Sequence, residues 1–302
     1  MRIIRFFSVA FFLGIAGLLT SCNNGAATTD QTSEAANDTP LSVEYPEEEL
    51  GWKLGAHSYT FRSFTFFEAI DKIDSCNLKY VEAFSSQVIG GGIDGKMDYK
   101  MDAATREKVL EKLKEKGVAM YAYGVENPDN EADWKHLFEF GKAMGIQTFT
   151  SEPDEKFLPL ISRLCDEYGI RLAIHNHPTP RHYWDPETVH AAIEGQSELV
   201  GACADVGHWV RSGLDPIECL KKLEGHIFHL HMKDLNYKEG KDEGAEDRDV
   251  PWGTGVANTD GVIKELKRQN FKGMISAEYE RHWEHNTPYV KQSVEYFRTA
   301  LQ

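Results

Sequence analysis

The chain has 302 residues, with 48 acidic and 33 basic side chains, and its formal net charge is −15 at pH 7. A surface this acidic repels phosphate backbones, so we expect no nucleic-acid partner. Cys76, Cys165, Cys203 and Cys219 lie in apolar patterns, which predict small buried side chains rather than a disulfide framework.

Residues 1–21 have the pattern of a secretory signal peptide. Arg2 and Arg5 precede an apolar run from Phe6 to Leu19, and small residues follow before Cys22. The stretch "LTSC" that ends at Cys22 resembles the bacterial lipobox, in which the signal is cleaved before a cysteine that becomes lipidated. An ordinary signal peptide is the alternative. We therefore predict an exported bacterial lipoprotein, periplasmic or held at the outer membrane through Cys22.

Residues 22–45 are polar and small, and contain almost nothing that could form a core. Such a stretch cannot offset the entropy lost on ordering, so we predict a flexible tether from the membrane to the domain. The folded domain is predicted to span 46–302, on the order of the 250 residues that are typical of a (β/α)₈ barrel.

Within this domain, short apolar segments alternate with helical patterns. Alternating strands and helices, with strands too apolar to be half exposed, indicate a parallel sheet covered by helices. Eight such units predict an α/β fold, a single (β/α)₈ TIM barrel; an open doubly wound sheet is the alternative, but no Gly-rich turn follows the first strand. The predicted strands span 52–61, 78–85, 118–126, 147–153, 171–178, 201–209, 226–234 and 273–280.

The intervening segments carry helix signals. Asp102 can cap a helix that packs Val109, Leu110 and Leu113 inward and ends at Gly117. Two further helices should end at glycines in the same way. Their inward-facing residues are predicted to be Trp134, Leu137, Phe138 and Gly141 before Gly145, and Phe157, Leu160, Ile161, Leu164 and Tyr168 before Gly169.

Ionisable side chains gather at the C-terminal ends of the last five strands. Reacting groups of a TIM barrel lie at these ends, and burying so many charges is costly unless they are paired or bind a cation. Mixed imidazole and carboxylate ligands suit one divalent ion, Mn²⁺, Zn²⁺, Fe²⁺ or Co²⁺. The residues are Glu152; His175 and His177; Asp205 and His208; His229, His231, Lys233 and Asp234; and Glu278 and Glu280.

Four motifs in order carry a family resemblance: "LAIHNHP", "DVGHW", "HLHMKD" and "ISAEYE". Together they resemble the sugar phosphate isomerase/epimerase family, the xylose-isomerase-like barrels that also include AP endonuclease family 2. The resemblance covers roughly residues 50–302. It implies a TIM barrel in which one metal ligand ends each of strands five to eight.

The resemblance implies metal ligands at Asp205, His231 and Glu278. His208 matches a substrate-side histidine of the family, and His177 stands where a second one is common. These positions imply a sugar-binding pocket next to the ion.

His175 is the departure, because the family usually has there a metal-binding glutamate that also serves in acid/base catalysis. Glu152, from the neighbouring strand, could restore a carboxylate as ligand or as base; its alternative is an N-cap or surface acid. We therefore keep five metal candidates, Glu152, His175, Asp205, His231 and Glu278, and expect four to be used. Catalytic roles are predicted for Glu152, His175 and Glu278.

Further residues could bind the substrate or orient the ligands. Lys233 and Asp234 fall at the family's "KD" and could orient His231 or contact the sugar. Other side chains could either face a substrate or serve packing and loops. These are Trp209, Trp252, Trp283, Tyr59 and Tyr279, of which we expect one or two to stack on sugar, and the strand-end residues Glu82, Glu126 and His57.

The predicted activity is removal of a proton alpha to a carbonyl by a divalent-metal-dependent enzyme. An exported domain without a Gly-rich phosphate loop favours a non-phosphorylated keto-sugar or a 3-keto-glycoside as substrate. Isomerisation or epimerisation and eliminative cleavage share this first step, and the broken glutamate pair favours elimination slightly. A non-catalytic carbohydrate-binding lipoprotein with a structural metal is the alternative. Phosphodiesterase action on abasic DNA is disfavoured by the charge and by the absence of His on strands two and three.

Overall fold

The computed structural model describes residues 44–236 and 249–302. The predicted signal peptide (1–21), Cys22 and nearly all of the predicted tether (22–45) lie outside the described residues. Within the described ranges, no helix combines the length and apolarity needed to cross a membrane.

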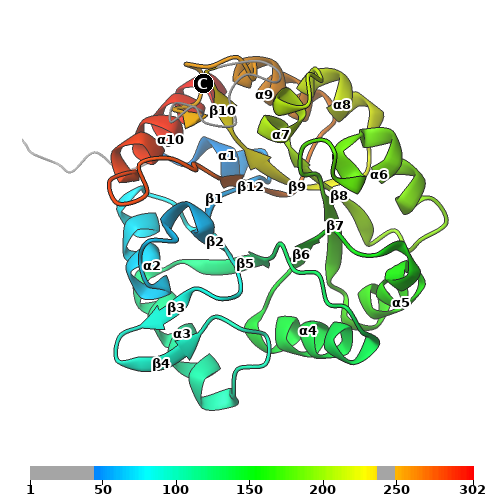
Figure 1. Cartoon of the computed structure of the whole chain (residues 1–302). Coiled ribbons are helices and arrows are strands. Elements are labelled where there is room, and N and C mark those ends of the chain that lie inside the picture. Colours follow the sequence, from blue (N-terminus) through cyan, green and yellow to red (C-terminus); the bar gives the residue numbers. More distant parts are fainter. Residues whose placement is uncertain (1–43, 237–248) are drawn as a thin grey trace, which may run out of the picture. The chain divides into compact units, whose positions relative to one another are not determined.

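Eight parallel strands of the described residues close into a barrel (Figure 1). The last of these strands, β12, pairs with both β1 and β9, which completes the ring. The predicted TIM barrel and its eight strands are confirmed. The strands are β1 (Lys53–His57), β2 (Tyr80–Ala83), β5 (Ala119–Tyr123), β6 (Thr148–Ser151), β7 (Arg171–His175), β8 (Val200–Asp205), β9 (Ile227–Met232) and β12 (Met274–Ala277).

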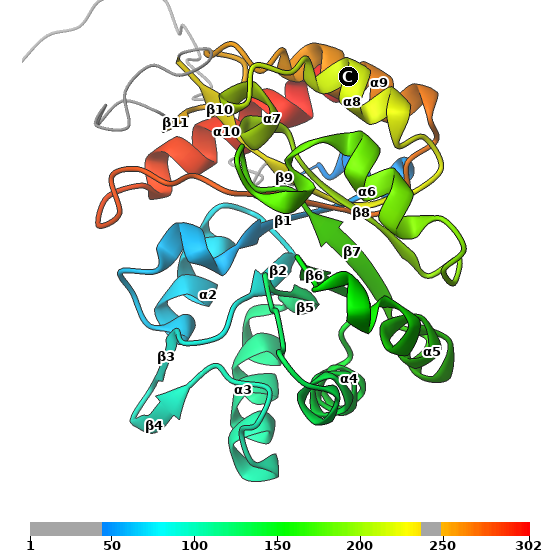
Figure 2. The same ribbon diagram turned by 45° about the vertical axis from the view of Figure 1, so that its right-hand side comes forward.

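Helices surround the barrel on its outer side (Figure 2). They bury one face of each amphipathic pattern against the strands, as expected for a parallel sheet that is covered by helices. The helices are α1 (Pro46–Glu49), α2 (Phe66–Ser75), α3 (Ala103–Lys116), α4 (Glu131–Met144), α5 (Leu158–Tyr168), α6 (Pro186–Ile193), α7 (Val206–Arg211), α8 (Pro216–Lys222), α9 (Thr259–Arg268) and α10 (Thr287–Leu301).

Helix α3 has the N-terminal cap and the C-terminal glycine that the sequence predicted. The Asp102 side chain accepts a hydrogen bond from the Thr105 N–H, and the helix ends at Gly117, which has a φ of 63° that favours glycine. Val109 and Leu113 are buried as predicted. The prediction for Leu110 was wrong, because its side chain is 38% exposed on the outer face.

Two features after strand ends differ from the prediction. The predicted strand 201–209 stops at Asp205, whose side chain accepts the His208 N–H and begins helix α7. A short antiparallel hairpin, β3 (Val88–Gly90) and β4 (Ile93–Lys96), follows β2 and was not predicted.

A second small sheet, of β10 (Asp234–Leu235) and β11 (Asp249–Val250), follows β9. The Asp234 carboxylate accepts hydrogen bonds from the backbone N–H groups of Gly253, Gly255 and Ala257. The "KD" aspartate therefore organises the loop after β11 rather than His231.

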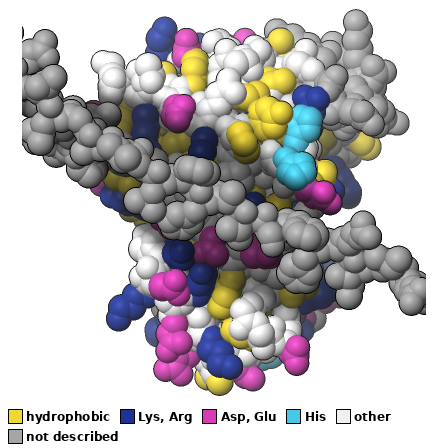
Figure 3. Space-filling view, turned by 90° about the vertical axis from the view of Figure 1, so that its left-hand side faces the viewer, with side chains coloured by type: hydrophobic (Ala, Val, Ile, Leu, Met, Phe, Trp, Pro, Cys, Tyr) yellow, Lys and Arg dark blue, Asp and Glu magenta, His cyan; other side chains and the backbone are white. Residues whose placement is uncertain are grey.

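The four cysteines of the described residues are buried and free, as predicted. On the face shown in Figure 3, acidic and basic side chains are interspersed with hydrophobic ones. The barrel fold leaves one end of the strands, the C-terminal end, to carry the ionisable groups described next.

Candidate metal centre and pocket

Asp205, His231 and Glu278 meet at the C-terminal end of the barrel. They come from neighbouring strands, since Asp205 ends β8, His231 lies on β9 and Glu278 directly follows β12. The His231 Nδ1 atom is 2.9 Å from Glu278 Oε2 and 3.8 Å from Asp205 Oδ2. All three side chains are buried. They form a group of donors that could hold a metal ion.

His175, at the end of β7, places a fourth donor beside this group. Its Nδ1 lies 3.0 Å from Glu152 Oε1, and its Nε2 lies 3.6 Å from Asp205 Oδ2. Because a carboxylate only accepts, Nδ1 carries the proton and the Nε2 atom faces Asp205. His175 replaces the expected glutamate and also turns a nitrogen toward the other candidate ligands.

Two buried imidazole nitrogens among the candidate ligands indicate whether a metal ion fits there. His175 Nε2 and His231 Nδ1 are both buried and lack a hydrogen bond of acceptable geometry within the described residues, although carboxylate oxygens lie 3.6 Å and 2.9 Å from them. Buried polar atoms without partners are rare in proteins, and two that converge with two carboxylates match the donor set of a divalent first-row ion.

The electrostatics of this group also favour a cation. Burial raises the pKa of Asp205, but His208 and Lys233 outweigh it and lower the value well below its usual range. The pKa of Glu278 is lowered in the same way, because Lys233 and His231 outweigh burial. Both carboxylates are therefore ionised at neutral pH. Burial lowers the pKa of His231, yet nearby groups including Cys203, Glu82 and Glu278 raise it well above its usual value.

The Lys233 ammonium supplies part of the required positive charge. Its Nζ donates to Asp205 Oδ2 (2.9 Å) and Glu278 Oε2 (2.6 Å), and it is 3.0 Å from Glu280 Oε1. One ammonium thus faces three carboxylates, and Arg211 Nη1 lies 3.8 Å from the second oxygen of Glu280. Lys233 is fully buried and does not line the pocket, so the structure pairs it with the carboxylates instead of placing it at a sugar.

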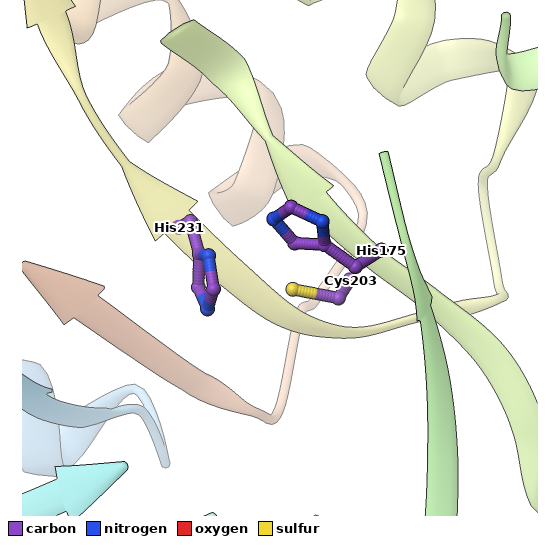
Figure 4. A group of neighbouring side chains, drawn as sticks. All are labelled: His175, Cys203 and His231. Atoms are coloured by element: carbon purple, nitrogen blue, oxygen red, sulfur yellow. The ribbon is translucent and has the colours of Figure 1, made fainter. Parts of the chain in front are cut away.

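Cys203 lies beneath this group, between the rings of His175 and His231 (Figure 4). The donor atoms of the three residues lie within 4.8 Å of one another. Burial raises the pKa of the Cys203 thiol to about 12, so in the absence of a metal ion the thiol is neutral.

Glu152 lies on the Nδ1 side of His175, with its carboxylate shared between two imidazoles. Its Oε1 accepts from Nδ1 of His175 and from Nδ1 of His177. Burial raises the pKa of Glu152, but these hydrogen bonds outweigh it and lower the value to about 2. The structure therefore presents Glu152 as an ionised residue that orients two histidines.

Glu82, which the sequence placed in a substrate contact or a solvated loop, lies instead inside the barrel. Its Oε2 accepts from Nε2 of His229 and Nε2 of His231, each at 2.8 Å, and from Ser276 Oγ at 2.8 Å. Its Oε1 accepts from Thr150 Oγ1 at 2.6 Å. The bond to His231 fixes the proton on Nε2, so that Nδ1 is left to face Asp205 and Glu278.

A pocket of about 330 Å³ opens over the candidate ligands. Some of the aromatic residues that were predicted to stack on sugar are too deeply buried to reach a ligand. The prediction for Trp209 was wrong, because helix α7 begins at Val206 and turns the Trp209 ring into the hydrophobic core. Trp252 and Tyr279 are also buried. The lining residues are His57, Tyr59, Phe84, Val125, His175, His177, His208, Glu278 and Glu280.

His177 and His208 lie side by side in this pocket. Their rings stack with centroids 5.0 Å apart and an interplanar angle of 28°. Arg211 donates to His208 Nδ1 at 3.0 Å, which leaves the proton of this imidazole on Nε2. Burial, together with Lys233 and Arg211, holds the pKa of His208 well below its usual value, so this imidazole is neutral.

Residues 70–300 match the family described as xylose isomerase-like TIM barrel. The chain belongs to this family. The sugar phosphate isomerase/epimerase resemblance is thereby confirmed at the level of the xylose isomerase-like barrels.

Relatives and solved structures of this family extend the comparison. Inosose dehydratase of Bacillus cereus (strain AH820) is 30% identical over 149 residues, 44% of this chain and 49% of that protein. Inosose dehydratase of Mesomycoplasma hyopneumoniae (strain 7448) is 27% identical over 150 residues, with similar coverage of 45% and 49%. The chain spans about half the length of the curated relatives it matches. The structure of an uncharacterized protein from Parabacteroides distasonis ATCC 8503 is 33% identical, with a TM-score of 0.68 over 82% of this chain and 99% of that one.

Two more distant solved structures of the same fold were determined with a metal ion. The IOLI protein, with a bound zinc atom, is 17% identical with a TM-score of 0.64, and covers 82% of this chain and 98% of that one. A Mycobacterium smegmatis barrel in complex with magnesium is 13% identical with a TM-score of 0.66, and covers 83% and 96%. At these identities the likeness shows the shared fold.

Proposed function

We propose that the domain is a divalent-metal-dependent enzyme that removes the proton alpha to the carbonyl of a non-phosphorylated keto-sugar or 3-keto-glycoside. Elimination of the substituent on the next carbon is the favoured outcome, and isomerisation or epimerisation is the other outcome of the same first step. The observation that carries the proposal is a set of four buried donors, from His175, Asp205, His231 and Glu278, which form overlapping groups beside one pocket.

The four donors would hold the ion through His175 Nε2, His231 Nδ1 and one oxygen each of Asp205 and Glu278. A bound divalent ion would polarise the substrate carbonyl and so acidify the adjacent C–H. Metal dependence in this chain is supported by the two buried nitrogens and by the ionised carboxylates that meet them.

Two stacked imidazoles supply complementary proton positions next to the candidate ion site. His177 donates through Nδ1 to Glu152, so its Nε2 has the lone pair of a general base. His208 accepts at Nδ1 from Arg211, so its proton is on Nε2, which lies 3.5 Å from Asp205 Oδ2 and could donate to a substrate oxygen. We assign proton abstraction to His177, positioning of that base to Glu152, and stabilisation of developing oxygen charge to His208.

This arrangement favours elimination over epimerisation. Epimerisation needs one group on each face of the substrate carbon, to remove a proton and to return it. Here the two imidazoles stack on each other and His175 takes the place of one glutamate. The similarity to proteins named inosose dehydratase supports the same outcome, since a dehydratase removes the elements of water by elimination.

The lining of the pocket supports a non-phosphorylated substrate. Among the described residues that line it, none is Lys or Arg, whereas Glu278 and Glu280 are acidic. A phosphate group would meet repulsion there instead of the cationic or helix N-terminal partners that phosphate sites use. Export as a lipoprotein, predicted from residues 1–22, is consistent with a substrate met outside the cytoplasm.

The test combines metal content with turnover. Purified protein should retain about one divalent ion per chain, and His231→Ala and Asp205→Ala should lose it. Glu126→Gln should keep it, because the hydrogen bonds of the Glu126 carboxylate within the described residues come from Ser85. Incubation with 3-keto-glucosides should release the alcohol of the leaving group.

The outcomes separate the candidate functions. Epimerisation of free ketohexoses without cleavage would favour the isomerase alternative. Sugar binding with turnover of neither substrate would favour the carbohydrate-binding lipoprotein. Full metal retention in both the His231 and Asp205 variants would contradict the metal centre.

A further inference from the structure

The pocket over the candidate metal centre has two chemically different sides. One side carries the ionisable residues His175, His177, His208, Glu278 and Glu280. The remaining lining residues are Tyr59, Phe84 and Val125, together with His57, whose ring contacts Tyr59 and Phe84 as well as His231. A keto-sugar presents hydroxyl and carbonyl groups to the ionisable side, and an aromatic group bonded to that sugar would cover more of the apolar side than the C–H face of the sugar ring can.

The apolar side is a fixed aromatic surface built from segments far apart in the chain. The Tyr59 ring meets the Phe84 ring edge-on, with centroids 5.3 Å apart at 76°. It also meets the Trp283 ring edge-on, at 5.9 Å and 84°. The Arg62 guanidinium covers the Trp283 ring at 3.8 Å and also bonds to the Tyr59 hydroxyl. These contacts hold Tyr59 in place before any ligand arrives.

All three aromatic side chains are half-buried, although barrel residues of this size usually pack into the core. Partly exposed aromatic surface next to a pocket marks a binding surface, because leaving it in water costs free energy that a ligand would recover. Trp209 and Trp252, by contrast, are buried and serve the core.

A column of rings joins this surface to the candidate ligands. The Tyr59 ring stacks on the His57 ring, with centroids 5.9 Å apart at 25°. The His57 ring in turn stacks on His231, at 5.1 Å and 26°. Tyr59 therefore lies two ring spacings from His231, and it lines the same pocket as His175 and Glu278, so a group that contacts Tyr59 can be bonded to the reacting sugar.

We propose that Tyr59, Phe84 and Trp283 bind the leaving group of the substrate, and that this group is aromatic, which makes the substrate class an aryl 3-keto-glycoside. This inference rests on the proposed function and deepens it. In the reaction, the base takes the proton from C2 of the sugar, and its electrons form the C1–C2 double bond. The C1–O bond breaks, its electron pair leaves with the aglycone oxygen, and a proton completes the free phenol. The sugar leaves as an enone, so atoms and charge balance without a co-reactant.

The test measures binding separately from turnover. Phenyl β-glucoside and methyl β-glucoside lack the ketone and cannot eliminate, so their dissociation constants report the aromatic surface alone. We expect the phenyl compound to bind about tenfold more tightly than the methyl compound, because one additional aromatic contact and the burial of its ring increase the binding free energy by about that factor in affinity. Isothermal titration with the full-length protein gives both constants.

Variants show which residues carry this preference. Tyr59→Leu and Phe84→Leu should reduce the phenyl preference to about threefold or less, and Tyr59→Phe should keep it. Tyr121→Leu is the matched control, because Tyr121 is a half-buried tyrosine in a similar edge-on pair, with Tyr80 at 5.9 Å, outside the pocket lining.

The outcomes of this test and of the turnover test are distinguishable. Equal affinity for the two glucosides, or no measurable binding of the phenyl compound, overturns the aglycone site even if 3-keto-glucosides are cleaved. A phenyl preference that survives both leucine substitutions also overturns it. A preference that the variants remove, in a protein that cleaves no keto-glycoside, supports the aromatic site and contradicts the proposed reaction instead.

Discussion

Replacement of Glu82 by glutamine should weaken metal binding although Glu82 itself faces away from the ion. In the wild-type chain, Glu82 Oε2 accepts from Nε2 of His231, which leaves His231 Nδ1 for the ion. A glutamine has one amide NH₂ in place of a carboxylate oxygen, and that NH₂ donates. Whichever way the amide turns, the charge that favours the Nε2-protonated form of His231 is removed.

The expected loss of metal affinity can be estimated because Glu82 is a hydrogen-bond partner of the metal ligand His231. Loss of such a partner typically lowers metal affinity by about 10- to 100-fold, which is about 1.4–2.7 kcal/mol. Three donors share Oε2 and one binds Oε1, so a turned amide leaves at least one buried donor without an acceptor. This unmet donor should also lower the free energy of unfolding, by about 1–3 kcal/mol.

Competition with a chromophoric chelator measures the metal dissociation constant of each protein. Glu126→Gln is the matched control: it replaces another buried glutamate near a strand end, and the Glu126 carboxyl touches no imidazole of the described residues. We expect the control to stay within about threefold of wild type. A folded Glu82→Gln protein with unchanged metal affinity would refute the role given to Glu82.

Three further predictions concern stability and packing. The pKa of Glu152 is lowered to about 2 in the folded metal-free protein and is about 4.3 in an unfolded chain, so its contribution to the free energy of unfolding is fully present above about pH 4.3 and is lost as the pH falls toward 2. The unfolding free energies of wild type and Glu152→Gln, measured in urea, should therefore differ more at pH 6 than at pH 3. A difference that does not change with pH would contradict this role of Glu152. Asp234→Asn should lower the unfolding free energy by about 1–3 kcal/mol, since the carboxylate holds several backbone N–H groups of the loop after β11; an unchanged midpoint in urea would show that the loop does not need it. Trp209→Phe should lower the free energy of unfolding by about 1–3 kcal/mol in thermal unfolding, and the dissociation constant of phenyl β-glucoside should stay unchanged. Weaker binding of this glucoside by a variant of unchanged stability would show that Trp209 contacts the ligand.

The barrel could be predicted from sequence because its signals are local and repeated. Each strand is a short apolar run, and helices such as α3 begin at a capping side chain and end at a glycine. The ligand positions followed from one further rule, that side chains at the C-terminal ends of parallel strands meet. Asp205, His231 and Glu278 therefore fell together as the motifs implied.

The rest depends on side-chain direction and on contacts across the barrel, which no local pattern encodes. Glu82 becomes buried only because His229, His231 and Ser276, about 150 to 200 residues later in the chain, supply its hydrogen bonds. Trp209 turns inward because Asp205 caps a helix where an extended strand was expected. The β3–β4 hairpin has three consecutive glycines at its turn and too few alternating apolar residues to give a strand signal.

A crystal structure of the metal-loaded protein, with the ion located by its anomalous scattering, tests the metal centre most directly. We expect one ion bound by His175 Nε2, Asp205, His231 Nδ1 and Glu278, with Glu152 still hydrogen-bonded to Nδ1 of His175. An ion coordinated by a Glu152 oxygen, with His175 turned away from it, would contradict this ligand set.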